Sequence, residues 1–265
     1  MNVSSKLLLR FILLLTIMII FCFPILYMFF PIQTSDWEKV FSPNWINAVY
    51  NSVIIAIFSV VANLLIGFPA AYVFSRYRFM GDKHIFFFLL WNRMTPSSVF
   101  LLPYLIMYLS IGLYNTFLGV VLAYFSFNLP ISIWLFASFM GMIPNEIDEQ
   151  AKVDGYNLYN YFSKIFIPLC RQAIIIVAFF VWLQTWNEMF IASILTQYDT
   201  MPLNARLFML CNRLGQFGDT GLACTVGVIT ILPGLILLYW ARAFLSKGFT
   251  LGKVFHTWKS IKTSI

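Results

Sequence analysis

Six long apolar runs constrain the fold of this 265-residue chain more than any other feature of its sequence. Each run is close to the ~20 residues that an α-helix needs to cross the hydrocarbon core of a membrane. A transmembrane β-barrel would instead show segments of about ten residues with alternating hydrophobicity. The sequence therefore predicts an all-α membrane protein with six transmembrane helices in one domain, residues 1–265. The predicted spans are residues 7–30, 47–74, 85–109, 117–140, 171–195 and 222–245.

The basic residues predict how these spans are oriented. Of the 17 lysines and arginines, 13 lie before or at the start of the first run, between the second and third, between the fourth and fifth or at the start of the fifth, or at and after the end of the sixth. Three lie on the other side, and Arg93 falls inside the third run. Because cytoplasmic loops of membrane proteins carry an excess of Lys and Arg, both termini and residues 141–168 are expected in the cytoplasm. The same rule accounts for the net charge of +7 without a nucleic-acid partner.

Residues 141–168 form an unusually polar segment for so apolar a chain. Asn145 is expected to cap a short helix whose first carboxylates favour the positive end of the helix dipole. Gly155 permits a turn with positive φ, and a second short helix is expected to end at Pro168. A helix lying on lipid would favour Lys and Arg on its polar face, so this segment is expected to dock on a soluble partner. Its four carboxylates are Glu146, Asp148, Glu149 and Asp154.

The pattern Glu149-x-Ala151, Asp154-Gly155 and Ile165-x-Ile167-Pro168 resembles the EAA loop of permease subunits of bacterial ABC importers. Other motifs resemble the carbohydrate-importer branch of that family, which includes the maltose-type permeases, and they occur in the same order. The chain departs from the family at Gln150, where a second alanine is common. The further motifs are Met94-x-Pro96, Gly112-Leu113-x-Asn115-Thr116, Leu129-Pro130-x-Ser132-Ile133-Trp134, Ile143-Pro144-x-Glu146, Trp186-Asn187-Glu188 and Lys247-Gly248-Phe249-Thr250-x-Gly252.

The resemblance implies a permease subunit of an ATP-driven importer in the bacterial cytoplasmic (inner) membrane. Its partners would be a second homologous permease, two ATP-binding subunits and an extracytoplasmic solute-binding protein that delivers an oligosaccharide or related solute. The chain itself would bind no cofactor, because ATP and Mg would be held by the ATP-binding subunits. The residues implied to dock the ATPase, or to pack the docking helix onto the membrane domain, are Glu149, Ala151, Asp154, Gly155, Ile165 and Pro168.

Polar residues within the runs indicate a second candidate site. Ionisable groups inside a membrane are expensive and normally face a cavity or a partner. Arg93 and Glu188 could pair with each other and only hold two helices together, or they could line a polar path, where Arg93 would attract an anionic solute. Sugars are bound by planar hydrogen-bonding groups and aromatic faces. The residues expected on such a path are Asn92, Arg93, Tyr124, Asn128, Gln184, Trp186, Asn187 and Glu188.

Other classes of function find little support in the sequence. The Gly-x-x-x-x-Gly-Lys-Ser/Thr nucleotide loop is absent, so the chain is not expected to hydrolyse ATP. The runs contain no histidine, and the four cysteines share no short spacing, so neither a catalytic nor a metal site is expected. The alternative is a stand-alone secondary transporter, although such folds usually carry a duplicated half. The identity of the solute stays open.

Overall fold

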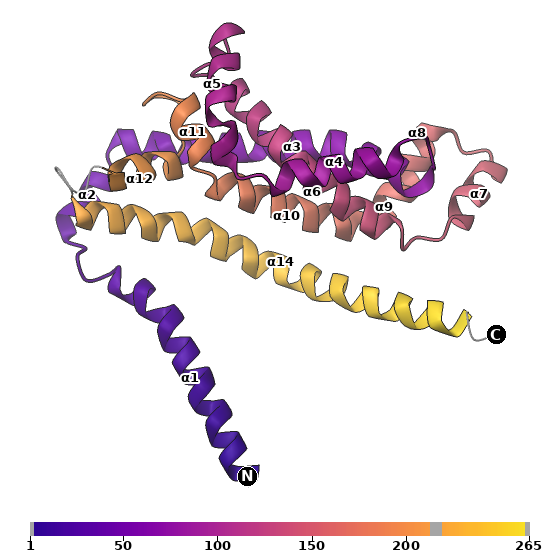
Figure 1. Ribbon diagram of the computed structural model, residues 1–265, viewed down its shortest axis with the longest axis horizontal. Coiled ribbons are helices and arrows are strands. Elements are labelled where there is room, and N and C mark those ends of the chain that lie inside the picture. The colour runs from indigo at the N-terminus through magenta and orange to yellow at the C-terminus, as the bar shows by residue number, and fades with distance from the viewer. Residues whose placement is uncertain (1–2, 213–218, 263–265) are drawn as a thin grey trace.

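All regular elements in the described part of the chain are helical (Figure 1). The computed structural model describes the backbone of residues 3–212 and 219–262, and the side chains of residues 11–212 and 219–242. The elements, in chain order, are α1 (Val3–Tyr27), α2 (Thr34–Val40), α3 (Pro43–Arg76), α4 (Asp82–Met94), η1 (Ser97–Phe100), α5 (Leu101–Ser110), α6 (Phe117–Met140), α7 (Glu146–Val153), α8 (Leu158–Tyr161), η2 (Phe162–Phe166), α9 (Ile167–Leu169), α10 (Arg171–Asn187), α11 (Phe190–Leu195), α12 (Leu203–Asn212) and α14 (Thr220–Lys262).

Three of these helices are long and apolar enough to cross a membrane: α3, α6 and the segment Thr220–Arg242 of α14. Two bent pairs of helices raise the number to five if each pair is one span: Asp82–Met94 with Ser97–Ser110, and Leu158–Leu169 with Arg171–Asn187. The described apolar part of α1, Phe11–Tyr27, is shorter. The described residues thus form an all-helical membrane protein with three to five candidate spans, and the expected count of six stays a prediction.

Two of the predicted runs are not single straight helices. The run 85–109 bends by 95° between α4 and η1, because Pro96 favours an extended conformation for Thr95, whose ψ is 131°. The run 171–195 breaks after Asn187, where Glu188 is extended with ψ of 128° before α11 begins. Polar stretches, residues 92–98 and 184–188, interrupt the two apolar runs at these points, so the sequence does carry a sign of each break.

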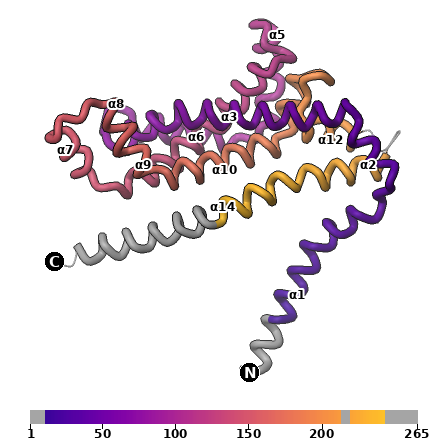
Figure 2. Tube along the Cα trace, turned by 180° about the vertical axis from the view of Figure 1, so that it is seen from behind, coloured from indigo at the N-terminus to yellow at the C-terminus, as the bar shows by residue number. Residues whose placement is uncertain are grey.

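Helices α3, α6 and α10 pack side by side and form the centre of the molecule (Figures 1 and 2). A Cβ built on Gly67 of α3 would lie only 3.3 Å from Cβ of Ser132, so a small residue brings α3 close to α6. Ser132 Oγ donates to Asn63 Oδ1 at 3.1 Å, and Asn128 Nδ2 donates to Thr185 Oγ1 at 3.3 Å. These hydrogen bonds satisfy buried polar groups and link all three helices.

The turn between α5 and α6 gives a physical reason for one of the sequence motifs. Gly112 and Asn115 have φ of 73° and 57°, which favour glycine and asparagine. Thr116 caps α6, since its Oγ1 accepts a hydrogen bond of 3.0 Å from the backbone N–H of Gly119. Asn115 Oδ1 accepts a 2.7 Å hydrogen bond from the backbone N–H of Gln197, which joins this turn to the segment after α11.

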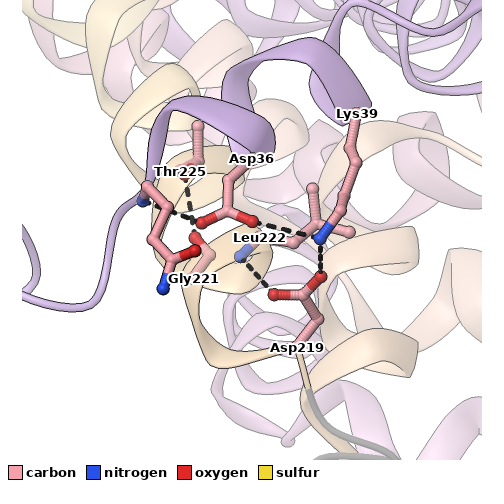
Figure 3. Close-up of polar contacts among 7 residues, drawn as sticks. Asp36, Lys39, Asp219, Gly221, Leu222 and Thr225 are labelled. Carbon is pink, nitrogen blue, oxygen red and sulfur yellow. Dashed lines mark hydrogen bonds and ion pairs between the residues drawn. The ribbon is translucent and has the colours of Figure 1, made fainter.

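Helix α2 is held against the start of α14 at the end of the molecule opposite α7 and α8 (Figures 1 and 3). Lys39 Nζ lies 3.2 Å from Asp36 Oδ1 and also donates to the Asp219 carboxylate. Asp36 lies so close to α14 that a Cβ on Gly221 would overlap its Oδ2. By contrast, α1 extends away from the other helices in both views, and its described side chains, residues 11–27, are all exposed.

Candidate functional site

The polar loop contains the short helix that the sequence predicts. Helix α7 begins after Asn145, and three carboxylates lie in its first turn. The prediction that the Asn145 side chain caps this helix is wrong, because that side chain makes no hydrogen bond to the first turn of α7. Its Oδ1 instead accepts a hydrogen bond of 2.7 Å from Nη1 of Arg76, at the end of α3. The same Nη1 donates to the carbonyl of Ile143 at 2.8 Å, so Arg76 holds the segment that directly precedes α7.

The turn predicted at Gly155 is confirmed by its φ of 78°. The Tyr156 N–H donates to the Ala151 carbonyl at 3.0 Å, which closes the end of α7. A Cβ built on Gly155 would meet nothing within 4 Å, so only the backbone conformation requires glycine here. This turn leads directly into α8.

The two faces of α7 differ in burial. Asp148 and Ala151 face the body of the molecule and are only 9% and 4% exposed. Ala151 packs with the buried aromatic cluster, so its side chain is not part of the outward face where an ATPase groove would meet it. The outward side chains include Glu149, Asp154 and Val153, the last of which is 87% exposed.

Asp148 fixes α7 to the membrane domain through a buried ion pair. Its Oδ2 lies 2.7 Å from Nε of Arg76, and the two side chains are only 11% and 5% exposed. The Arg76 N–H points away from the line between these atoms, so the contact is an ion pair without a hydrogen bond. The Tyr161 hydroxyl donates to Asp148 Oδ1 and so ties α8 to the same point. The sequence shows four acids in this loop and gives no sign that one of them points inward.

The apolar part of the loop packs on the same region. Phe166 is fully buried, with its ring centroid 5.0 Å from that of Tyr72 and 6.0 Å from that of Phe68. Ile165 is half-buried and packs on the same cluster, whereas Pro168 is exposed in the first turn of α9. The loop is therefore held rigidly against α3 and exposes only its outer face.

A polar cavity of about 200 Å³ lies between α4, α6 and the break after α10. It brings together six of the eight residues predicted for a substrate path. They are Arg93, Tyr124, Asn128, Gln184, Asn187 and Glu188. Asn128 is 4% exposed and already hydrogen-bonded to Thr185, so its amide also has a structural role.

Trp186 and Asn92 do not line this cavity. The Trp186 ring is buried and stacks on that of Trp182, with 5.1 Å between centroids. Its Nε1 donates to the Thr230 carbonyl at 3.0 Å and so holds α10 against α14. Its aromatic face is thus covered by its own chain.

Arg93 and Glu188 share the cavity without pairing. Among the described residues, Arg93 makes no ion pair within 4.0 Å, and its Nε is buried without a hydrogen-bond partner. Its Cζ lies 5.1 Å from the centroid of the Phe127 ring. Glu188 Oε1 accepts a 3.1 Å hydrogen bond from the Phe190 N–H, and Oε2 accepts one of 3.1 Å from Ile191. Glu188 is therefore occupied in capping α11.

The cavity also contains four residues that were not predicted to line it, namely Ser97, Phe127, Met189 and Phe190. Phe127 follows Tyr124 by three positions and precedes Asn128, so helical spacing alone would have placed all three on one face. The other three lie at or directly after the polar stretches 92–98 and 184–188, where the two chain breaks occur. The side chains of the terminal motif, residues 247–252, lie outside the described residues.

Comparison with known proteins shows the family. Residues 63–250 match the model for the binding-protein-dependent transport system inner membrane component. The osmoprotective compounds uptake permease protein GgtD of Synechocystis sp. is 31% identical over 209 residues, which cover 78% of this chain and 70% of that protein. The trehalose transport system permease protein SugB of Mycobacterium tuberculosis is 28% identical over 211 residues, which cover 78% and 76%.

The fold is also similar to that of a solved transporter. A bacterial ABC transporter involved in the import of the acidic polysaccharide alginate has a chain that matches with a TM-score of 0.73 and 20% identity. The match covers 92% of this chain and 98% of that one. The family match argues against both a stand-alone secondary transporter and an ATPase. The chain belongs to the inner membrane components of binding-protein-dependent transport systems, and is the permease subunit of an ABC importer.

Proposed function

We propose that this chain is one of two permease subunits that together form the pathway of an importer for a sugar or oligosaccharide. Two ATPase subunits would drive it by docking on residues 141–168, and an extracytoplasmic binding protein would deliver the solute. The names of the relatives, which include permeases for osmoprotective compounds and for trehalose, support the class of solute. ATP and Mg would be bound by the ATPase subunits.

The observation that carries this proposal is a rigid loop with an exposed mixed face. Asp148 and Phe166 fix the loop to α3, while Glu149 and Asp154 point outward beside exposed apolar side chains. Leu158 and Tyr159 are 71% and 80% exposed beside these acids, so the outer face of the loop offers apolar as well as charged groups to a partner. A rigid projection of this kind transmits motion of a docked subunit to the helices behind it.

The same proposal includes six spans with both termini in the cytoplasm. The positive-inside bias supports this orientation, because Arg76 contacts the loop, Arg78 and Lys83 follow Arg76 closely in the chain, and the opposite end has few basic residues. The exposed apolar helix α1 would be the first span, and its lack of cover suits contact with lipid or with a second permease.

The polar cavity is proposed as part of the solute pathway. Gln184 and Asn187 offer planar amides, and Tyr124 and Phe127 offer aromatic rings, which suits a hydroxylated solute. Closure of the ATPase dimer on ATP would draw the two docking loops together and open the pathway outward. Hydrolysis would then return it to the inward-open state.

Charge reversal on the outer face of α7 tests the proposal. We expect Glu149→Lys to reduce the ATPase subunits recovered with the chain from membranes, and to reduce ATPase stimulation by the solute-loaded binding protein. The matched control is Glu38→Lys, since Glu38 is exposed on α2 at the opposite end of the molecule. Equal recovery of ATPase subunits with both variants would contradict the docking assignment.

A further inference from the structure

Among the side chains that the structure describes, none supplies a counter-charge to Arg93. The residue lies at the end of α4, inside a candidate span, where a charge is expensive unless something neutralises it. A guanidinium stays protonated in proteins, so it cannot reduce this penalty by losing its proton. Within the described side chains, Arg93 has neither an ion pair nor a hydrogen bond, and its Cζ lies 5.1 Å from the centroid of the Phe127 ring.

Glu188 does not supply the missing charge, although it lines the same cavity. Its two oxygens accept hydrogen bonds from the backbone N–H groups of Phe190 and Ile191, and its position is set by the start of α11. Moving it to Arg93 would leave these donors unsatisfied. The cavity therefore keeps two separate charged walls, one cationic and one anionic.

Each wall suits a different part of an acidic saccharide. A carboxylate or phosphate can take a charge-assisted hydrogen bond from the Arg93 guanidinium. Glu188 accepts hydrogen bonds, and so would receive a hydroxyl of the same solute, as would the amide oxygens of Gln184 and Asn187. A neutral saccharide would satisfy the second wall, and its hydroxyl oxygens could accept from Arg93, but it would leave the charge of Arg93 without a counter-charge.

Resting on the proposed function, we infer that this cavity selects solutes that carry both hydroxyl groups and an anionic group, which is the chemistry of an acidic saccharide. Arg93 is the residue that recognises the anion. The amides and Glu188 orient the hydroxyls, and Phe127 supports the guanidinium from one side.

The test uses the whole transporter in lipid vesicles, with its binding protein outside. The solutes are an oligosaccharide of uronates, a sugar phosphate and neutral oligosaccharides of matched length. We expect ATPase stimulation and uptake with an acidic solute, the two acidic arms distinguishing carboxylate from phosphate. Arg93→Gln should lower uptake roughly ten- to a hundredfold, the usual effect of losing a hydrogen bond to a charged group. Arg93→Lys, which retains the cation, should recover part of it.

Controls separate recognition from assembly. Arg78→Gln removes an arginine whose side chain is 84% exposed, and should leave uptake unchanged. The amount of assembled complex and its ATPase rate without solute show whether Arg93→Gln only destabilises the protein. If Arg93→Gln does not assemble, the inference is tested by comparing Arg93→Lys with the wild type on acidic and neutral solutes. Stimulation by neutral saccharides alone, or unchanged uptake of an acidic solute by assembled Arg93→Gln, would overturn the inference and leave the proposed function intact. No stimulation by any solute would overturn the proposed function, and the inference with it.

Discussion

Replacing Asp148 with alanine should detach α7 from the end of α3. The substitution leaves the Arg76 guanidinium buried without its ion-pair partner, and removes the acceptor of the Tyr161 hydroxyl. Because both charged side chains are about nine-tenths buried, the ion pair belongs to the buried class, in which loss of one partner costs about 3–5 kcal/mol. The opening equilibrium of α7 should rise roughly a hundred- to several-thousandfold, since 1.4 kcal/mol is a factor of ten.

Amide hydrogen exchange in the purified complex measures this opening directly. We expect the amides of α7 to lose protection by that factor, or to lose it completely where the wild-type protection is smaller. Amides in the middle of α6 and α10 should keep theirs, because they are hydrogen-bonded within these helices and do not depend on the Asp148 ion pair. Transport should fall together with the protection of α7, while the protein still inserts.

The matched control is Glu149→Ala, the next carboxylate on the same helix, which points outward. It should weaken ATPase docking without altering exchange in α7. The double variant Arg76→Met with Asp148→Leu should recover part of the local stability, because apolar pairs often replace buried ion pairs at little cost, although the hydrogen bonds of Arg76 to Asn145 and Ile143 and of Tyr161 to Asp148 are still lost. Equal exchange in Asp148→Ala and Glu149→Ala would refute the assignment of Asp148 as the anchor.

Three further predictions concern other parts of the chain. Gly155→Pro should abolish transport and uncouple ATPase activity without preventing insertion, because proline fixes φ near −65° where the structure has 78°; normal uptake by this variant would contradict the role of the turn. Gly221→Val should lower the thermal stability of the purified protein, because its Cβ would overlap Asp36. Gly234→Val is the control for placing a valine in the same helix, because the structure leaves open space there. The hydrogen bond between Lys39 and Asp219 raises the pKa of Lys39 and lowers the pKa of Asp219. This contact should therefore stabilise the protein at neutral pH. Its contribution should weaken as pH falls below the ordinary pKa of Asp219, and also as pH rises above the ordinary pKa of Lys39. The difference in melting temperature between the wild type and Lys39→Met, measured against pH, should be flat from about pH 5 to about pH 9.

The sequence predicted the class of fold and the position of the loop, because both depend on local composition. Hydropathy marks an apolar helix whatever it packs against, and a glycine after a short acidic helix marks a turn. The inward position of Asp148 depends instead on Arg76, which lies 72 positions earlier in the chain. Likewise, nothing near Trp186 indicates that its ring packs between α10 and α14 rather than in a polar path.

The two chain breaks, at Thr95–Pro96 and at Glu188, belong to one feature of the molecule. Irregular backbone at membrane depth is tolerated only where it is buried in protein or lines a cavity, because lipid cannot satisfy the freed N–H and C=O groups. The first break, at Thr95 and Pro96, lies between the cavity residues Arg93 and Ser97. The second break begins at Glu188, which also lines the cavity and satisfies the backbone N–H groups exposed there. The polar cavity is thus the physical condition that allows both breaks, and the breaks in turn place its charged residues.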